Sequence, residues 1–193
     1  MIIATLIPIN CFLLVISCYD DVKRNSNQLR SAANFAFQGI GFHSTKQEIM
    51  KKWPKSQSRI IQFETDKNMA SEPNFLMVNV ESICVTEKID NVPMILALYD
   101  YYDGRVVKIT IVYDKIKLED AGDDLLIERE LIRIIGDPNY QSTGKVNICD
   151  WELDSVKRKF TIISSDTLVM LEAYDTGMDD IIARKKEAIL LKK

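Results

Sequence analysis

Residues 92–113 decide the fold, and they read VPMILALYDYY (92–102), DG (103–104) and RVVKITIVY (105–113). Both flanks are rich in β-branched and aromatic residues, which favour strands. The Asp103-Gly104 pair between them is a strong hairpin signal, because a type I′ turn needs positive φ at both central residues. In the second flank alternate residues share one face. The stretch therefore predicts an antiparallel β-hairpin.

Outward from the hairpin, helix and strand signals alternate. Thr45 followed by Glu48 is a capping box and predicts a helix that stops at Pro54. A second helix is predicted over 118–135, with Leu125, Leu126, Ile132 and Ile135 as its apolar stripe and Gly136-Asp137-Pro138 at its end. Strands are predicted at 58–64, 75–85, 146–153, 159–164 and 168–174, and a last helix begins at Asp179. This mixture predicts an α+β fold.

A weak internal repeat runs through these elements. Residues 48–54 parallel 130–138, and residues 107–114 parallel 169–175. We interpret the pattern as two similar halves, 35–114 and 115–193, each a helix plus an antiparallel sheet, with the helices packed on one face of the sheet. The alternative is that any α+β chain offers such partial matches.

The composition limits the classes of function. The chain has 193 residues, 47% of them hydrophobic and 27% charged, which suits a single globular domain. Its formal net charge of −3 lacks the strongly basic field that nucleic-acid binding requires. We therefore expect no nucleic-acid partner.

The N-terminus predicts export. Met1 to Ser17 contain no charged side chain, and residues 12–16 are continuously apolar. The run is shorter than the roughly 20 residues of a membrane-spanning helix and fits a secretory signal over 1–18. No Lys or Arg precedes it, so a buried first strand or a wrongly placed start codon is the alternative.

Val15-Ile16-Ser17-Cys18 resembles the lipobox of bacterial lipoproteins. The resemblance implies that Cys18 is lipidated and is the only membrane contact, through its acyl chains. Ordinary cleavage and a soluble secreted product is the alternative. We predict a polar tether over 19–34 and an α+β domain over 35–193, in a periplasmic or membrane-anchored protein.

Cys84 and Cys149 are the two cysteines beyond this segment. An oxidising compartment permits a disulfide between them, which would link the two halves. Two buried free thiols are the alternative, because a disulfide needs Cα atoms within about 7 Å.

Catalytic and metal chemistry is poorly supported. His43 is the single histidine, so a histidine-based relay is not expected. Neither cysteine has a second ligand at zinc spacing, and no glycine-rich phosphate loop is present. The acids near the hairpin tip and at 120–124 are explained by turn and helix-start chemistry. We expect no cofactor, no metal and no catalytic residues.

Two segments, Gly39–Pro54 and Glu130–Pro138, resemble the helix-to-turn signature of small bacterial envelope proteins. These include the small lipoproteins of outer-membrane assembly and folds related to β-lactamase inhibitor protein. The resemblance implies protein binding in the envelope, and we expect a non-enzymatic binding or scaffold module with a protein partner. A small secreted hydrolase that uses carboxylates is the alternative.

The partner surface is predicted at the hairpin tip. Tyr99, Tyr101 and Tyr102 crowd one end of the first hairpin strand, and Arg105 follows the turn. Tyr and Arg are common at interface hot spots, so Tyr102 and Arg105 are the partner-binding candidates. The alternative is that these tyrosines are structural.

Overall fold

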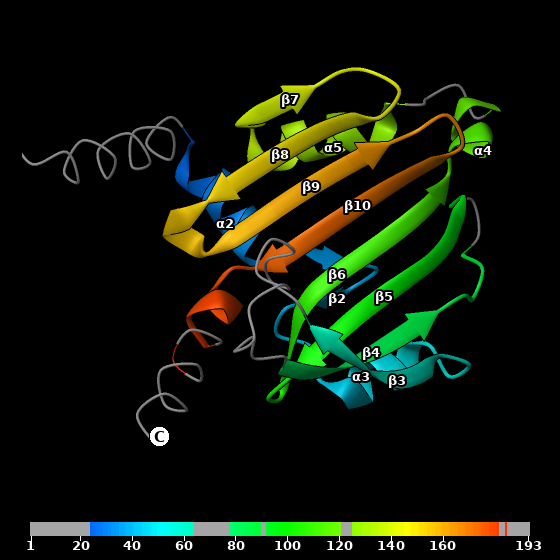
Figure 1. Cartoon of the computed structure of the whole chain (residues 1–193), viewed down its shortest axis with the longest axis vertical. Helices are drawn as coiled ribbons and strands as arrows, with labels where there is room; N and C mark the ends of the chain where they lie inside the picture. Colours follow the sequence, from blue (N-terminus) through cyan, green and yellow to red (C-terminus); the bar gives the residue numbers. More distant parts are fainter. Residues whose placement is uncertain (1–23, 64–77, 90–91, 121–124, 182–183, 185–193) are drawn as a thin grey trace, which may run out of the picture.

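One antiparallel sheet dominates the computed structural model, which describes residues 24–63, 78–89, 92–120, 125–181 and 184. The sheet has eight strands in the order β3-β4-β5-β6-β10-β9-β8-β7 (Figure 1). The strands are β3 (Gln57–Phe63), β4 (Val78–Val85), β5 (Met94–Tyr102), β6 (Arg105–Asp114), β7 (Tyr140–Ser142), β8 (Asn147–Leu153), β9 (Arg158–Ser164) and β10 (Leu168–Asp175). A second sheet pairs β1 (Ala36–Phe37) with β2 (Ile40–Gly41).

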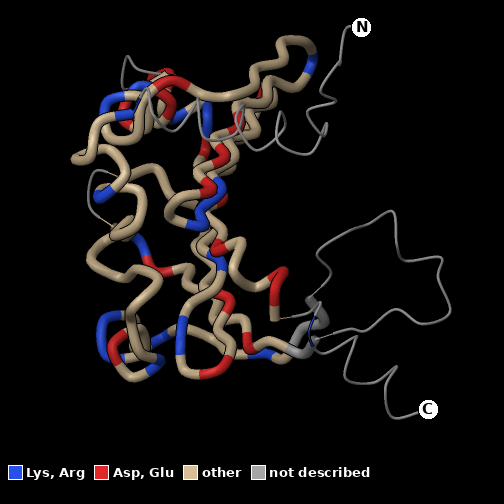
Figure 2. The backbone as a smooth tube through the Cα atoms, turned by 90° about the vertical axis from the view of Figure 1, so that its left-hand side faces the viewer, with Lys and Arg blue, Asp and Glu red and all other residues tan. Residues whose placement is uncertain are grey.

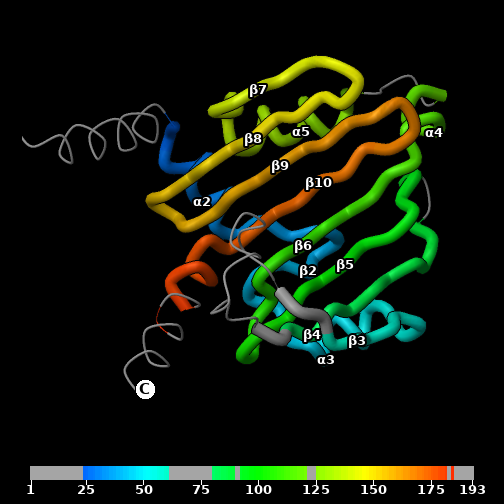
Figure 3. The backbone as a smooth tube through the Cα atoms, viewed as in Figure 1, coloured from blue at the N-terminus to red at the C-terminus, as the bar shows by residue number. Residues whose placement is uncertain are grey.

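The predicted hairpin is confirmed as β5 and β6. Asp103 and Gly104 have φ of 49° and 81°, the positive values that the turn demands. β6 then pairs antiparallel with β10, and Ile111 lies opposite Leu171. Figure 3 shows these two strands, far apart in the sequence, side by side at the middle of the sheet.

Helices cover one face of this sheet. In Figure 1 α2 (Ser26–Ala33), α3 (Lys46–Lys52) and α5 (Leu126–Ile135) lie behind it, and α4 (Lys115–Asp120) follows β6 directly. Buried helix residues and alternate strand residues form one core, including Ala32, Ile49, Leu131, Ile135, Tyr99, Ile109, Trp151 and Phe160. The hydrophobic effect on this face therefore holds the helices to the sheet.

Local helix signals match the structure at two points. Thr45 caps α3 and both hydrogen bonds of its capping box with Glu48 are present. α5 ends at Gly136, whose φ of 87° is a value that glycine adopts without strain. Both signals were readable because each acts within one helical turn.

The predicted polar tether is wrong over its second half. Ser26–Ala33 is the helix α2, capped by a reciprocal pair of hydrogen bonds between Asn25 and Gln28. Ala32 is fully buried in the core, and α2 packs against α5. Tertiary burial of one small apolar face therefore stabilises a helix whose sequence is mostly polar.

The predicted helix over 118–135 is also wrong, because it is two helices, α4 and α5. Leu118 is buried in α4, whereas Leu131 and Ile135 are buried in α5. Leu125 and Leu126 are 52% and 42% exposed. Among the described residues of this stretch, the apolar side chains nearest the start of α5 are therefore not part of a buried stripe.

The structure confirms the α+β class, with one eight-stranded antiparallel sheet beside the small second sheet. It does not establish two similar halves, so the similarity of 35–114 and 115–193 stays a prediction. Among the described residues, no helix has the length and apolar character needed to cross a membrane. The predicted signal over 1–18 lies outside the described residues.

Candidate functional site

The sheet face opposite the helices is the candidate functional site, and we call it the open face. Strand side chains alternate between the two faces, so every second residue of β5, β6, β8, β9 and β10 points to it. One corner is covered by the helical residues 177–181, where Met178 packs on Val80 and Val107. None of the helices α2 to α5 lies over the rest of it (Figure 1).

An unbroken line of apolar side chains crosses the open face, and we call it the apolar row. Strand register aligns one residue from each of five adjacent strands: Leu96, Val112, Met170, Ile163 and Ile148. All five are half-buried. Leu168, two residues before Met170, extends the row and is 41% exposed. Five strands spaced about 4.8 Å apart make the row roughly 19 Å wide.

Polar rows run beside the apolar row. Two residues along β9 and β8 from Ile163 and Ile148, Thr161 donates a hydrogen bond to Asp150 at 2.6 Å. Lys108 is paired with Glu172 at 2.5 Å, and Lys159 with Glu152 at 3.0 Å. Figure 2 shows acidic and basic residues interspersed through the sheet seen edge-on. The open face thus presents an apolar strip with a polar flank, the pattern of a protein interface core and rim.

A buried polar pair lies within this flank. Ser82 on β4 and Asp100 on β5 are opposite each other in register and are 1% and 6% exposed. Burial raises the pKa of the Asp100 carboxyl. A hydrogen bond from the Ser82 hydroxyl opposes this rise. Asp100 Oδ1 itself has no hydrogen-bond partner in the described part of the chain.

The partner-binding candidates of the sequence lie at one corner of the open face. Tyr102 is half-buried against the cluster of Val80, Val107 and Met178. Tyr99 is fully buried on the helix side, and its hydroxyl donates to the Phe37 carbonyl at 3.4 Å. The structural interpretation therefore holds for Tyr99, while the role of Tyr102 in binding stays a prediction.

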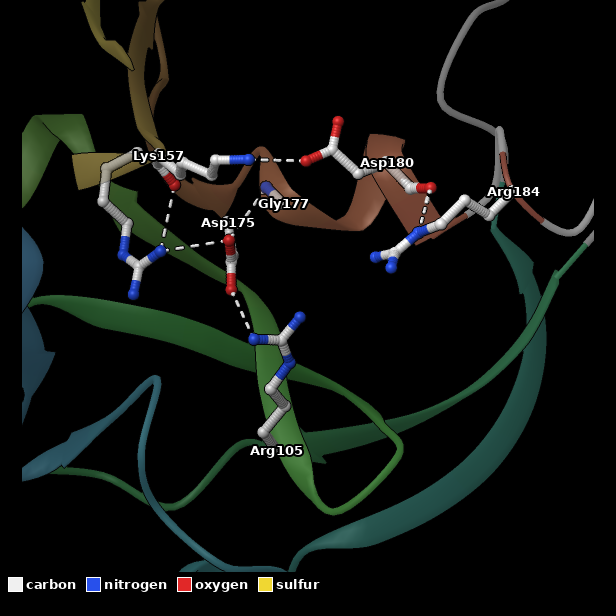
Figure 4. Close-up of polar contacts among 7 residues, drawn as sticks. Arg105, Lys157, Asp175, Gly177, Asp180 and Arg184 are labelled. Atoms are coloured by element: carbon white, nitrogen blue, oxygen red, sulfur yellow. Dashed lines mark hydrogen bonds and ion pairs between the residues drawn. The ribbon is translucent and has the colours of Figure 1, made fainter. Parts of the chain in front are cut away.

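Arg105 takes part in a buried charge cluster at the end of β10. Asp175 is 4% exposed and accepts a hydrogen bond from the Gly177 amide at 2.9 Å. Its carboxylate lies 3.0 Å from a terminal guanidinium nitrogen of Arg158 and 3.3 Å from one of Arg105. Figure 4 shows Arg105 and Gly177 directed at Asp175. Arg105 is 42% exposed in its side chain, so it serves this ion pair and still reaches solvent.

The possible disulfide between Cys84 and Cys149 does not fit this sheet, and both cysteines are free. Cys84 is on β4 and Cys149 on β8, with four strands between them. Five strand spacings amount to roughly 24 Å, far beyond the reach of an S–S bond. The disulfide is ruled out by the order of the strands in the sheet, which the sequence did not reveal.

We expect Cys149 to be a slow thiol in the folded protein. Burial, and then the nearby Glu128 carboxylate, raise the pKa of its thiol to about 11. At pH 8 this lowers the thiolate fraction roughly 100-fold below that of an ordinary thiol. Iodoacetamide labelling of native protein, read by peptide mass spectrometry, should modify Cys84 well before Cys149. After denaturation without reductant, both cysteines should be labelled equally. A disulfide-linked Cys84–Cys149 peptide would contradict the expectation.

The remaining sequence candidates are dispersed. Cys18 lies outside the described residues, and His43 is exposed. Asp103 is exposed in the hairpin turn, whereas Asp100 is buried three residues before it. No group of three or more His, Cys, Asp and Glu in the described residues is placed to hold a metal ion. The apolar row and the Ser82–Asp100 pair were missed, because neither forms a local motif.

Comparisons of this chain with models of protein families, with curated proteins and with solved structures gave no match.

Proposed function

We propose that this chain is an exported, non-enzymatic protein-binding or scaffold module of the bacterial cell envelope, and that its partner docks on the open face. The observation that supports this most is the apolar row, which five strands align by register. Contiguous apolar surface with a polar rim is what a monomer exposes when it has a partner to meet.

Export is supported by the uncharged segment from Met1 to Ser17 and by Cys18 directly after it. A lipid on Cys18 would hold the domain at a membrane, while the open face remained free to bind. A binding role also agrees with the resemblance of Gly39–Pro54 to small envelope proteins.

We also infer that the domain is built from two similar halves. The order of elements supports this, because α3 precedes β3 to β6 and α5 precedes β7 to β10. The last strand of each set, β6 and β10, meet antiparallel at the centre. Superposition of the two sets in an experimental structure would test the inference, and unrelated helix directions would contradict it.

A matched pair of leucine substitutions tests the open face. Leu168→Asp should abolish capture of the partner from the native envelope fraction, because it places a charge beside the apolar row. Leu126→Asp is the control, since Leu126 and Leu168 are 42% and 41% exposed, and Leu126 belongs to α5, which lies behind the sheet (Figure 1). Captured proteins are identified by mass spectrometry. A partner that binds both variants equally would contradict this docking surface.

A further inference from the structure

The Ser82–Asp100 pair is an unusual feature for the interior of a folded protein. Buried polar side chains nearly always have a hydrogen-bond partner, and leaving one without a partner costs stability. Here the Ser82 hydroxyl is a hydrogen-bond partner of the Asp100 carboxyl, but Asp100 Oδ1 has no partner of its own within the described residues. Such a group in a native protein requires an explanation, and a partner that the free chain does not supply is one.

The basic neighbours of Asp100 are Lys108, which is paired with another carboxylate, and Arg59, which is exposed. Lys108 is opposite Asp100 in register, but its ammonium group lies 2.5 Å from Glu172. Thr110 Oγ1 contacts Glu172 as well, at 3.5 Å. Arg59 is opposite Ser82 on the outer strand β3 and is exposed. No cation of the described chain donates to Asp100 Oδ1.

We propose that Ser82 and Asp100 form a binding site for one cationic hydrogen-bond donor, the ammonium or guanidinium group of a lysine or arginine on the docked protein. This inference rests on the proposed function and names the chemistry of the partner. A carboxylate accepts charge-assisted hydrogen bonds from either group, and the Ser82 hydroxyl oxygen accepts another. Ions such as Ca²⁺ take about six to eight oxygens, more than this pair provides.

The position of the pair suits a contact made alongside the apolar row. Leu96 and Asp100 are on the same face of β5, four residues apart, which is about 13 Å. Lys108 and Glu172 flank the pair, and their side chains are 24% and 27% exposed. A partner seated on the apolar row thus brings its own edge over Lys108 and Glu172. Because Asp100 is only 6% exposed, a long basic side chain reaches it by displacing these two flanking side chains.

The site has a defined pH dependence. Burial raises the pKa of Asp100 above its ordinary value of 3.8, Glu172 raises it further, and Ser82, Lys108 and Arg59 lower it. Only the carboxylate form binds a cation well. Affinity for the cation should therefore rise about tenfold per pH unit below that raised pKa and become constant above it.

Small cations serve as probes of the full mature chain. Methylammonium and methylguanidinium chloride are titrated at pH 8, and backbone amide shifts of β4 and β5 are followed by NMR. Saturable shifts centred on Ser82 and Asp100 are expected, at least tenfold weaker in Asp100→Asn and unchanged in the control Glu152→Gln on β8. Tetramethylammonium, a cation without donors, should give no such shifts. Equal effects of all three cations, or none, would overturn the site.

Thermal unfolding separates loss of binding from loss of folding. A raised carboxyl pKa gives stability below the unfolded-state pKa, and that stability is lost as pH rises through the folded-state pKa. Asp100→Asn should therefore melt at the same or a higher temperature than the parent at pH 8. A lower melting temperature would overturn the site, since it would show that the carboxylate is already satisfied. Leu168→Asp keeps the cation site, so failure of docking and failure of this site are distinguishable.

Discussion

Replacing Asp175 with alanine should lower the free energy of unfolding by about 3–5 kcal/mol, the cost of removing one partner from a buried ion pair. Asp175 is the carboxylate between Arg158 and Arg105. Arg158 is 8% exposed, and its Nε has no hydrogen-bond partner among the described residues. Burial lowers the pKa of the Arg158 guanidinium, and Asp175 opposes that effect. Without Asp175 a buried positive charge is left uncompensated.

Urea denaturation of the variants measures the effect. Asp180→Ala is the matched control, because Asp180 pairs with Lys157 at 2.5 Å in the same region, while both side chains are more than half exposed. Exposed pairs of this kind contribute little. Arg105→Ala should fall between the two, since that side chain is 42% exposed. If Asp175→Ala were as stable as Asp180→Ala, the ion pairs of Asp175 with Arg158 and Arg105 would not stabilise the fold.

Replacing Trp151 with alanine should also cost about 3–5 kcal/mol, through lost burial and the cavity that remains. Trp151 is fully buried, and it lies opposite Phe160 of β9. Its indole N–H donates to the Gly136 carbonyl at 2.7 Å, at the end of α5. The side chain therefore ties β8 to the C-terminus of α5 by packing and by one directed hydrogen bond.

Trp151→Phe separates these two contributions. Phenylalanine keeps most of the apolar area, so this variant should lose about 1–3 kcal/mol, mainly because the Gly136 carbonyl is left without its donor. Thermal or urea unfolding measures both variants. Tyr140→Ala on β7 is the control, because Tyr140 is 55% exposed. A Trp151→Phe protein as stable as the parent would show that the carbonyl finds another donor.

Sequence reasoning succeeded where the signal lay within a few residues. The Asp103-Gly104 turn and the Thr45 capping box were readable because backbone sterics and one hydrogen bond determine each of them. It failed for α2, although Asn25 and Gln28 form a capping box that could have indicated the helix start. The burial of Ala32 by tertiary contacts, which stabilises that helix, leaves no periodic pattern in so polar a segment.

The candidate site was not predictable in the same way. Each strand contributes one residue to the apolar row, and that residue looks like any other apolar strand residue. Only the register between β6 and β10, which pairs Val112 with Met170, makes the residues a row. Ser82 and Asp100 likewise became neighbours only when β4 paired with β5.

By itself, then, the sequence determined the α+β class, the central hairpin and the ends of α3 and α5, because turns and caps depend on residues that are adjacent in the chain. Tertiary structure alone decided the strand order, the free state of Cys84 and Cys149, and the grouping of Asp175 with Arg158 and Arg105. The physical reason is that strands pair through backbone hydrogen bonds, which are the same for every residue type except proline. Which strands meet is settled by burying all apolar faces together, and that is a property of the whole chain.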